Sequence, residues 1–489
     1  MMAIATPALA FKHDSFSRFL HEKPSGRAGH PGGACKRVKQ YRWMKPQADN
    51  ALGVYISIPF CRSKCTYCNF ASGVYPASDH ARYIERVIED MEQAGAWAEG
   101  MSVALPRKVD TVYLGGGTPS LLAPELLERL FAAIRANFTV EVDAEITVEC
   151  APGQIADATL AAFQSVGVNR VSMGVQSFVD REAQVSGRPH NRATVERDVE
   201  RLRAAGIANL NLDLIAGLAE QTFGSWEESL TALIGLNVPH ASVYMLEVDE
   251  DSRLGREMLG GGARYHAGLV PTDDAIAQMY TRAVERLGDV GLAQYEISNF
   301  SWPGFASKHN LRYWQRRPYL GLGLDASSLS FASQSTDALR STTTDHLKAY
   351  LAGPQPVETA WLSPARQHEE AWFLGLRLNT GVEPAALERE FGPELVAAAL
   401  QVVNRLAGDG LLEFEGNAVR LTARGRMVSN DVFQEFLGLD EGDSNALDLV
   451  RPEVKADVST DFDLGSSGHS NIAADKDAMV AEAFAASRK

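Results

Sequence analysis

Three of the chain's five cysteines lie close together in the stretch PFCRSKCTYCNF, residues 59–70. Cys61, Cys65 and Cys68 follow the pattern C-x3-C-x2-C, with no fourth cysteine close behind. In a long chain, such clustering indicates a metal site in a reducing compartment rather than a disulfide framework. A structural zinc ion takes four protein ligands, for which His80 is a candidate fourth. A [4Fe–4S] cubane is also normally held by four thiolates, so three cysteines would leave one iron open to an exchangeable ligand.

Glycines and polar residues recur where other apolar runs end. The segment YLGGGTPS, residues 113–120, has glycines that let a ligand approach the backbone closely, and it lacks the lysine of a phosphate-binding loop. Glu149 ends a third run, Gln176 lies near the end of a fourth, Asp213 lies inside a fifth, and Arg188 follows in GRPHN. Each residue alone is as readily a structural salt bridge or cap. Together they predict one site in which carboxylates accept hydrogen bonds and an arginine pairs with a carboxylate.

The elements that would position these residues alternate from residue 54 onward between short apolar runs and helical patterns such as 124–138 and 193–206. The runs are rich in Val, Ile and Leu, which is typical of parallel strands buried on both faces. They are residues 54–60, 109–114, 145–150, 170–178, 209–218 and 240–248. The repeat predicts an α/β fold over residues 44–300, a partial (β/α) barrel that is closed or nearly closed. The cysteine loop would lie at the C-terminal ends of its strands, where such barrels bind substrates. Residues 294–300 predict one further strand.

The C-terminal part of the sequence changes character. Residues 301–364 form a less regular connecting region. Residues 365–438 predict three helices followed by a short hairpin in LLEFEGNAVRLT, which indicates a winged-helix-like α+β module. Winged helices often bind DNA, but this one shows no recognition face rich in Lys and Arg. We therefore expect the module to pack against the barrel.

The composition sets further bounds. A chain of 489 residues predicts two or three domains, and its formal net charge of −15 argues against a nucleic-acid partner. No run reaches the roughly 18 apolar residues that a membrane span requires. The basic leader 1–43 and the acidic tail 439–489 are expected to be disordered. The leader is either a transit peptide or an inert segment before an alternative start at Met44. We expect Cys35 to be a free tail thiol and Cys150 a small buried hydrophobe.

The C-x3-C-x2-C loop after a barrel strand resembles the radical S-adenosylmethionine (SAM) superfamily. The resemblance implies that Cys61, Cys65 and Cys68 hold a [4Fe–4S] cluster whose fourth iron takes the amino and carboxylate groups of SAM. It also implies that reduction of the cluster cleaves SAM to methionine and a 5′-deoxyadenosyl radical, chemistry that belongs to the cofactor. The GGGTPS segment resembles the one that contacts the amino group of SAM.

The resemblance narrows to the oxygen-independent coproporphyrinogen oxidase family and covers residues 54–437. It is carried by VYISIPFC, YLGGGTPS, GVQSF, LDLIAGL and QYEISNF. Tyr67 matches an aromatic position of the family. The residues that match its SAM-contacting positions are Tyr55, Gly116, Gly117, Thr118, Glu149, Gln176, Arg188 and Asp213. The oxidase binds two SAM molecules, so some of these residues belong to a second site that is lost here.

Two markers divide the family. Phe70 stands where the oxidase has a further cysteine, and CTYCNF with this phenylalanine resembles the haem-chaperone branch. HNLRYW, residues 309–314, resembles that branch's H-N-x-x-Y-W haem-binding motif. The resemblance implies that His309 is an axial haem ligand; without it, a buried histidine beside a core tryptophan is the plainer interpretation. The chain departs from the family after this motif, where Leu324, Asp325 and Ser327 replace proline, glycine and histidine.

The resemblance implies a cytoplasmic haem chaperone that binds a [4Fe–4S] cluster, SAM and haem and passes haem to a client protein. Its partners would be that client and an electron donor for the cluster, with no nucleic acid and with membrane contact only through the client. Organellar targeting by residues 1–43 is the less favoured alternative. Two other functions stay open. One is a working coproporphyrinogen III oxidase, and the other is a zinc-stabilised interaction or DNA-binding protein.

Overall fold

The structure is a computed structural model that describes residues 51–354 and 357–439. The predictions for the leader 1–43, for Cys35, for Met44 as an alternative start and for the tail from residue 440 onward lie outside these residues.

One large sheet runs through the described residues in the order β12-β11-β10-β9-β1-β2-β3-β4-β5-β6-β8-β7. Its central strands are parallel neighbours in chain order, as the apolar runs predicted. They are β1 (Ala51–Ile58), β2 (Lys108–Gly116), β3 (Thr139–Cys150), β4 (Arg170–Gln176), β5 (Asn209–Ala216) and β6 (His240–Met245). The flanking strands are β7 (Ala293–Glu296), β8 (Asn299–Ser301), β9 (Tyr319–Leu322), β10 (Ser327–Phe331), β11 (Ala338–Thr342) and β12 (Glu358–Leu362). The prediction of an α/β partial barrel is confirmed. The expectation that the barrel closes is wrong, because the end strands β12 and β7 do not pair and the sheet is open.

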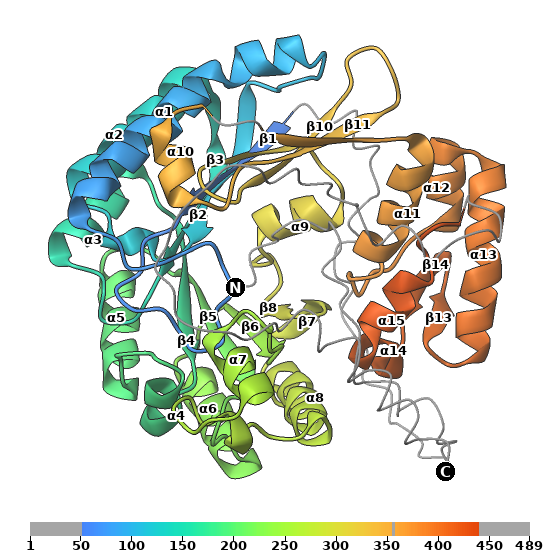
Figure 1. Ribbon diagram of the computed structural model, residues 1–489. Helices are drawn as coiled ribbons and strands as arrows, with labels where there is room; N and C mark the ends of the chain where they lie inside the picture. The colour runs from blue at the N-terminus through green and yellow to red at the C-terminus, as the bar shows by residue number, and fades with distance from the viewer. Residues whose placement is uncertain (1–50, 355–356, 440–489) are drawn as a thin grey trace, which may run out of the picture. The chain divides into compact units, whose positions relative to one another are not determined.

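Helices cover one face of the sheet, which we call the outer face (Figure 1). They are α1 (Ala77–Gly100), α2 (Pro124–Asn137), α3 (Asp157–Val166), α5 (Arg192–Ala204), α6 (Phe223–Gly235) and α8 (Asp273–Asp289), all of which contribute to one core. The short helices α4 (Asp180–Val185) and α7 (Arg253–Gly260) lie outside this core. The boundaries of the helices follow local signals. Pro124 opens α2, and the side chain of Asn191 accepts a hydrogen bond from Thr194 N to cap α5.

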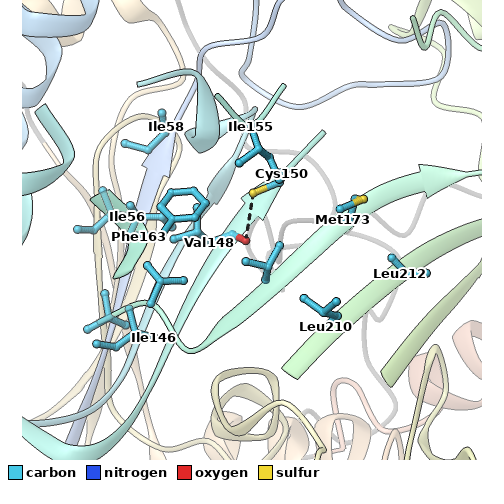
Figure 2. Packing of buried hydrophobic residues seen from close by; sticks show 14 of the residues in the cluster. Ile56, Ile58, Ile146, Val148, Cys150, Ile155, Phe163, Met173, Leu210 and Leu212 are labelled. Carbon is cyan, nitrogen blue, oxygen red and sulfur yellow. Dashed lines mark hydrogen bonds between the residues drawn. The ribbon is translucent and has the colours of Figure 1, made fainter. Parts of the chain in front are cut away.

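The main hydrophobic core lies between the sheet and the longer helices. Figure 2 shows Ile56, Val148 and Phe163 packed together within it. Cys150 is 4% exposed in this core, and its thiol points back to the carbonyl oxygen of Val148 at 3.9 Å. Burial raises the pKa of Cys150 far above its usual range, so the thiol stays neutral. The prediction of a small buried hydrophobe is confirmed at this position.

Residues 294–300 do not form the single strand that their apolar pattern suggested. They form the two short antiparallel strands β7 and β8 at the edge of the sheet, with β8 also paired to β6. The reversal is stabilised by the side chain of Glu296, which accepts hydrogen bonds from Ser298 N at 3.2 Å and from the amide of Asn299. A polar side chain that bonds its own backbone two residues onward favours a turn over continued pairing.

The C-terminal module has the predicted order of three helices and a hairpin. They are α11 (Pro364–Gly375), α12 (Pro384–Phe391), α13 (Pro393–Gly408), β13 (Leu412–Glu415) and β14 (Ala418–Leu421), followed by α14 (Ala423–Met427) and α15 (Ser429–Gln434). A second hydrophobic core unites this module with α9 (Lys308–Trp314). Within it, Trp372 stacks on Phe436 with ring centroids 5.2 Å apart. Arginines on the module's surface face acidic partners, as Arg420 does with Glu413 at 2.8 Å.

Candidate functional site

The face of the sheet opposite the outer face, which we call the inner face, is polar. Side chains alternate along each strand, so Tyr55, Thr111, Glu145 and Asn211 face away from the apolar core. Helix α9 lies against this face (Figure 1), and its His309 reaches Thr111 Oγ1 at 2.9 Å. The polar side chains of the inner face therefore lie between the strands and α9, and we call this region the polar interior.

The cysteine loop follows β1 at the C-terminal edge of the sheet. Cys61, Cys65 and Cys68 are partly exposed and form no disulfide. Their sulfurs make only weak contacts: Thr118 Oγ1 lies 3.8 Å from the sulfur of Cys61, and Ser72 Oγ lies 3.9 Å from that of Cys68. Burial raises the pKa of the Cys61 thiol. The sulfurs are held in place and remain available as ligands.

Backbone contacts fix the loop's path. Cys61 N donates to the carbonyl of Gly73 at 2.8 Å, and Thr66 N donates to the carbonyl of Ser186 at 3.1 Å. Lys64 Nζ donates to the carbonyls of Phe70 at 2.9 Å and Ser72 at 3.0 Å. Lys64 was not among the residues predicted from the sequence. Its position between Cys61 and Cys65 was the only sequence feature that could have indicated a role, and a solvent-exposed lysine is equally common at such a position.

The described residues show no ready-made site for a single metal ion. Across residues 51–354 and 357–439, no three His, Cys, Asp or Glu side chains converge to hold one ion. His80, the candidate fourth zinc ligand, instead stacks on Phe60 with ring centroids 3.8 Å apart. Thiolates that bind three different irons of a cubane need not meet at one point, whereas the ligands of a tetrahedral zinc must.

The glycine segment after β2 forms a backbone cradle beside the loop. Gly116 has φ +95°, and its N–H donates to Glu149 Oε2 at 3.2 Å. A Cβ at Gly117 would lie 2.7 Å from the carbonyl oxygen of Ile58 and 2.8 Å from that of Phe60. Both positions therefore require glycine, one for its backbone conformation and one for space.

Glu149 stands in this cradle at the end of β3. Its Oε1 accepts a hydrogen bond from the Tyr113 hydroxyl at 2.9 Å. Burial, reinforced by the negative charge of Asp213, raises the pKa of Glu149 to about 7. Tyr55 completes the group, because its hydroxyl would lie 3.5 Å from a Cβ at Gly116.

Gln176 and Arg188 approach the cradle from β4 and the loop after α4. Both side chains border Gly174, where a Cβ would lie 3.0 Å from Gln176 Nε2 and 3.1 Å from Arg188 Nη2. Arg188 Nη2 also donates to the hydroxyl of Tyr67 at 3.2 Å. Gln176 has φ +69°, a strained conformation for a residue other than glycine. Gln176 Oε1 and Arg188 Nε are buried without a hydrogen-bond partner in the structure, as expected where a polar ligand belongs.

Asp213 adjoins this group and is also engaged elsewhere. The register of β4 and β5 sets it beside Gly174. Its carboxylate accepts hydrogen bonds from Asn211 Nδ2 at 2.7 Å and Ser172 Oγ at 3.4 Å. Asn211 Oδ1 lies 2.6 Å from His240 Nδ1, so Asp213 belongs to a buried polar network through β5 and β6. A role in ligand contact and a role in this network are compatible, because a carboxylate has several acceptor positions.

His309 is enclosed by the protein. Its side chain is 0% exposed, and its Nδ1 and Nε2 lie 2.9 Å from Thr111 Oγ1 and 2.9 Å from the Tyr313 hydroxyl. Burial, reinforced by Arg312 and Arg170, holds the pKa of His309 well below its usual range, so the imidazole is neutral.

Helix α9 is anchored at both ends. Glu145 accepts hydrogen bonds from Lys308 N at 3.1 Å and His309 N at 3.0 Å at its start. Arg312, fully buried, donates to the carbonyl of Pro318 at 2.9 Å and pairs with Asp110.

The fold and the cysteine site together define a protein of the radical SAM class. The sequence profile of the Radical SAM superfamily matches residues 55–233, and that of the HemN C-terminal domain matches residues 362–428. The chain belongs to the haem chaperone HemW family. It is 33% identical over 386 residues to haem chaperone HemW of Lactococcus lactis, covering 78% of this chain and 96% of the relative. It is 32% identical over 392 residues to haem chaperone HemW of Bacillus subtilis, covering 78% and 98%.

Two further comparisons extend these findings. A mouse relative, radical S-adenosyl methionine domain-containing protein 1, mitochondrial, is 29% identical over 406 residues, covering 80% of this chain and 88% of its own. The solved structure of Escherichia coli coproporphyrinogen III oxidase (HemN), described as a radical SAM enzyme, superimposes with a TM-score of 0.67 at 21% identity. The match covers 79% of this chain and 90% of that one, and it supports the fold. In the part of the chain that the structure describes, no helix is both long and apolar enough to cross a bilayer.

Proposed function

We propose that this protein is a haem chaperone that binds a [4Fe–4S] cluster, SAM and haem and transfers the haem to an acceptor protein. The observation that carries the proposal is the receptive edge of the sheet, where three accessible thiols lie beside the glycine cradle and the unpartnered Gln176 Oε1 and Arg188 Nε. The naming of its relatives as haem chaperones supports haem as the cargo. Phe70, in place of a further cysteine, supports the same branch.

Cys61, Cys65 and Cys68 would hold the cluster, which supplies reducing electrons to SAM when it is bound. Gly116, Gly117 and Thr118 offer backbone to the amino end of SAM. The carboxylate of Glu149 suits the ribose hydroxyls, and the guanidinium of Arg188 suits the SAM carboxylate. Tyr55, Tyr67, Gln176 and Asp213 complete the proposed contacts.

Haem binding would involve the HNLRYW motif, with His309 as the axial ligand. Its neutral state suits an iron ligand, but both ring nitrogens already have hydrogen-bond partners. Nε2 must therefore leave the hydroxyl of Tyr313 before it can bind iron. Asn310 Oδ1 and Trp314 Nε1 are buried without partners in the structure, so the motif has polar atoms for a bound group.

The test is anaerobic purification and reconstitution, followed by iron and sulfide assay, SAM binding and haem titration. We expect about four irons per chain, saturable SAM binding, and haem that moves to an apo-haemoprotein when the two are mixed. Zinc without iron or sulfide would overturn the proposal and support the zinc-stabilised interaction protein.

A second candidate is oxygen-independent coproporphyrinogen III oxidase, which the superposition on HemN favours at the level of the fold. An anaerobic assay of the reconstituted protein with SAM, reductant and coproporphyrinogen III separates the two functions. Multiple turnovers to protoporphyrinogen would establish the oxidase, whereas haem transfer without turnover supports the chaperone. The client protein and the electron donor would be found only after that result.

A further inference from the structure

Arg170 is an exception among the buried arginines. In residues 51–354 and 357–439, five arginines are less than 9% exposed. Four have a carboxylate partner: Arg86 with Glu89 and Asp90, Arg312 with Asp110, Arg316 with Glu390, and Arg340 with Glu370. Arg170 is 2% exposed, and its Nε is buried without a hydrogen-bond partner in the structure. An isolated buried charge is strongly unfavourable unless something pairs with it.

Its position places the guanidinium in the polar interior. Arg170 begins β4 and alternates with Ser172 and Gly174, so its side chain extends from the inner face. Ser172 contacts Asp213, and Gly174 borders Gln176 and Arg188. Arg170 therefore begins the strand that ends at Gln176, the proposed SAM contact six residues further on.

Among the described residues, no carboxylate forms an ion pair with Arg170, although carboxylates lie in its wider surroundings. Glu149 and Asp213 act on Tyr113, and Glu145 and Glu296 act on Tyr295, two tyrosines that Arg170 also influences. Arg170 influences the pKa values of Tyr113, His240, Tyr295 and His309, which places it among these side chains. The two histidines have lowered pKa values and the two tyrosines raised ones, so all four are neutral near pH 7. Thr147, its register partner on β3, has an Oγ1 that is also buried without a partner. A cation and an unused hydroxyl thus face the same interior.

We infer that Arg170, with Thr147 beside it, binds a carboxylate of a ligand that enters the inner face between α9 and the cysteine loop. A guanidinium pairs with a carboxylate through two parallel hydrogen bonds, which Thr147 Oγ1 would supplement. The inference rests on the proposed function, which offers two carboxylate sources: the propionates of haem and the methionine end of SAM. Arg188 lies beside Gln176 at the C-terminal end of β4, where it suits the SAM carboxylate. Arg170 lies at the other end of β4, further from the cradle, and therefore suits a haem propionate.

The test compares each ligand with its counterpart that lacks the carboxylate. Full-length reconstituted protein is titrated with haem and with haem dimethyl ester, and with SAM and decarboxylated SAM, in wild type, Arg170→Lys and Arg170→Met. We expect wild type to prefer one carboxylate ligand by about tenfold or more, since hydrogen bonds to a charged group have this strength. Arg170→Met should bring that preference to near one, with Arg170→Lys intermediate.

The haem pair and the SAM pair together identify which carboxylate binds Arg170. They also distinguish a failure of the Arg170 site from a failure of the proposed function. If Arg170→Met loses only the preference for haem over its dimethyl ester, the ligand of Arg170 is a haem propionate. If it loses only the preference for SAM over decarboxylated SAM, the ligand is the amino-acid carboxylate of SAM. If wild type binds both ligands and Arg170→Met changes neither preference, the Arg170 site is wrong and the proposed function stands. If wild type binds neither haem nor SAM, both fail.

A stability measurement excludes a merely structural role. Removing an unpaired buried charge relieves its desolvation penalty, so ligand-free Arg170→Met should have a Tm equal to or above that of wild type. The matched control is Arg340→Met, which leaves Glu370 buried and unpaired and should lower the Tm. A drop for Arg170→Met as large as that for Arg340→Met would overturn the inference.

Discussion

The cysteine-loop edge and helix α9 both carry residue types that suit a cofactor, yet their principal candidate ligands, the three cysteines and His309, differ in how accessible they are. At the edge, the thiols are partly exposed, and Gln176 Oε1 and Arg188 Nε have no partner in the structure. In α9, the imidazole of His309 is fully buried and both of its nitrogens are engaged. The first region has partly exposed thiols, whereas iron ligation by His309 would require one of its existing hydrogen bonds to break.

The difference in accessibility between the cysteines and His309 affects how much each cofactor must rearrange the protein when it binds. A preorganised site binds its ligand without rearrangement. A site whose side chains already form hydrogen bonds within the protein binds more weakly, by the free energy needed to break those hydrogen bonds. Each buried hydrogen bond left unmade costs about 1–3 kcal/mol. We therefore expect cluster and SAM binding to need no movement of α9, and haem ligation through His309 to need a local opening around Tyr313.

The largest expected effect is at the cysteine edge. Cys65→Ser should reduce iron from about four per chain to below one, because a cubane with two thiolates is not retained. Far-UV circular dichroism should be unchanged, since Cys65 is partly exposed in a loop. The control is Cys150→Ala, which alters a buried thiol in the core and should keep its iron. Full iron and sulfide in Cys65→Ser would remove the cluster assignment.

Helix α9 provides the next effect. His309→Ala should weaken haem binding at least about tenfold and change the haem absorption spectrum, because the axial ligand is lost. It should also reduce the free energy of unfolding by about 2–4 kcal/mol, since Thr111 and Tyr313 lose buried partners. Haem titration measures the change in affinity, and urea unfolding measures the change in the free energy of unfolding.

Tyr313→Phe sharpens this prediction because it releases His309 Nε2 and leaves the imidazole in place. Its haem affinity should equal or exceed that of wild type. If Tyr313→Phe weakens haem binding while His309→Ala does not, His309 is a structural residue and the ligand lies elsewhere.

A smaller effect concerns pH at the cradle. The raised pKa of Glu149, about 7, means that its acceptor form is depleted below neutrality. SAM affinity in wild type should fall about tenfold from pH 8 to pH 6, and Glu149→Gln should bind more weakly with a flatter profile. Equilibrium dialysis against pH decides this, and an unchanged slope in Glu149→Gln would assign the titration to another group.

The same carboxyl affects stability in a predictable direction. Its folded pKa lies above the ordinary value of 4.5, so the folded state holds the proton more tightly than the unfolded chain. The contribution to stability therefore decreases as pH rises from about 4.5 to about 7. Glu149→Gln should lack this decrease in urea unfolding measured across that range.

The smallest effect tests the connection between the two regions. The hydroxyl of Tyr295 lies 2.9 Å from His240 Nε2 and accepts from Ser307 N, the N-cap residue of α9, at 3.2 Å. Tyr295→Phe should lower the free energy of unfolding by about 1 kcal/mol and leave the iron content unchanged. Tyr265→Phe, in a partly exposed loop, is the matched control and should show no change. A loss of iron in Tyr295→Phe would show that the two regions are tightly coupled.

Much of the fold could be predicted from sequence because the signals are local. The strands β1–β6 are continuous apolar runs, and the helices between them have a regular period with capping residues at their ends. The cysteine spacing predicted a loop at the end of a strand. The SAM-contacting set depended on the family resemblance, and its assignment to Tyr55, Glu149, Gln176, Arg188 and Asp213 remains a prediction.

Two features of the fold were not evident from these signals. The run 294–300 was apolar enough for one strand, but the bonds of Glu296 to Ser298 and Asn299 divide it into β7 and β8. Whether the sheet closes depends on its edge strands, and no local pattern states which strands will pair.

The sequence by itself determined the cysteine spacing and the strand ends that carry the candidate residues, because side-chain types and spacing are written in it. The SAM and haem assignments came from the family resemblance and stay predictions. Only the tertiary structure decided which of the candidate residues are available. His309 is enclosed by Thr111, 198 positions away, whereas Arg170 Nε is buried without a hydrogen-bond partner in the described structure. The physical reason is that a buried polar group is satisfied by whatever the fold brings within about 3 Å, and those partners come from distant parts of the chain.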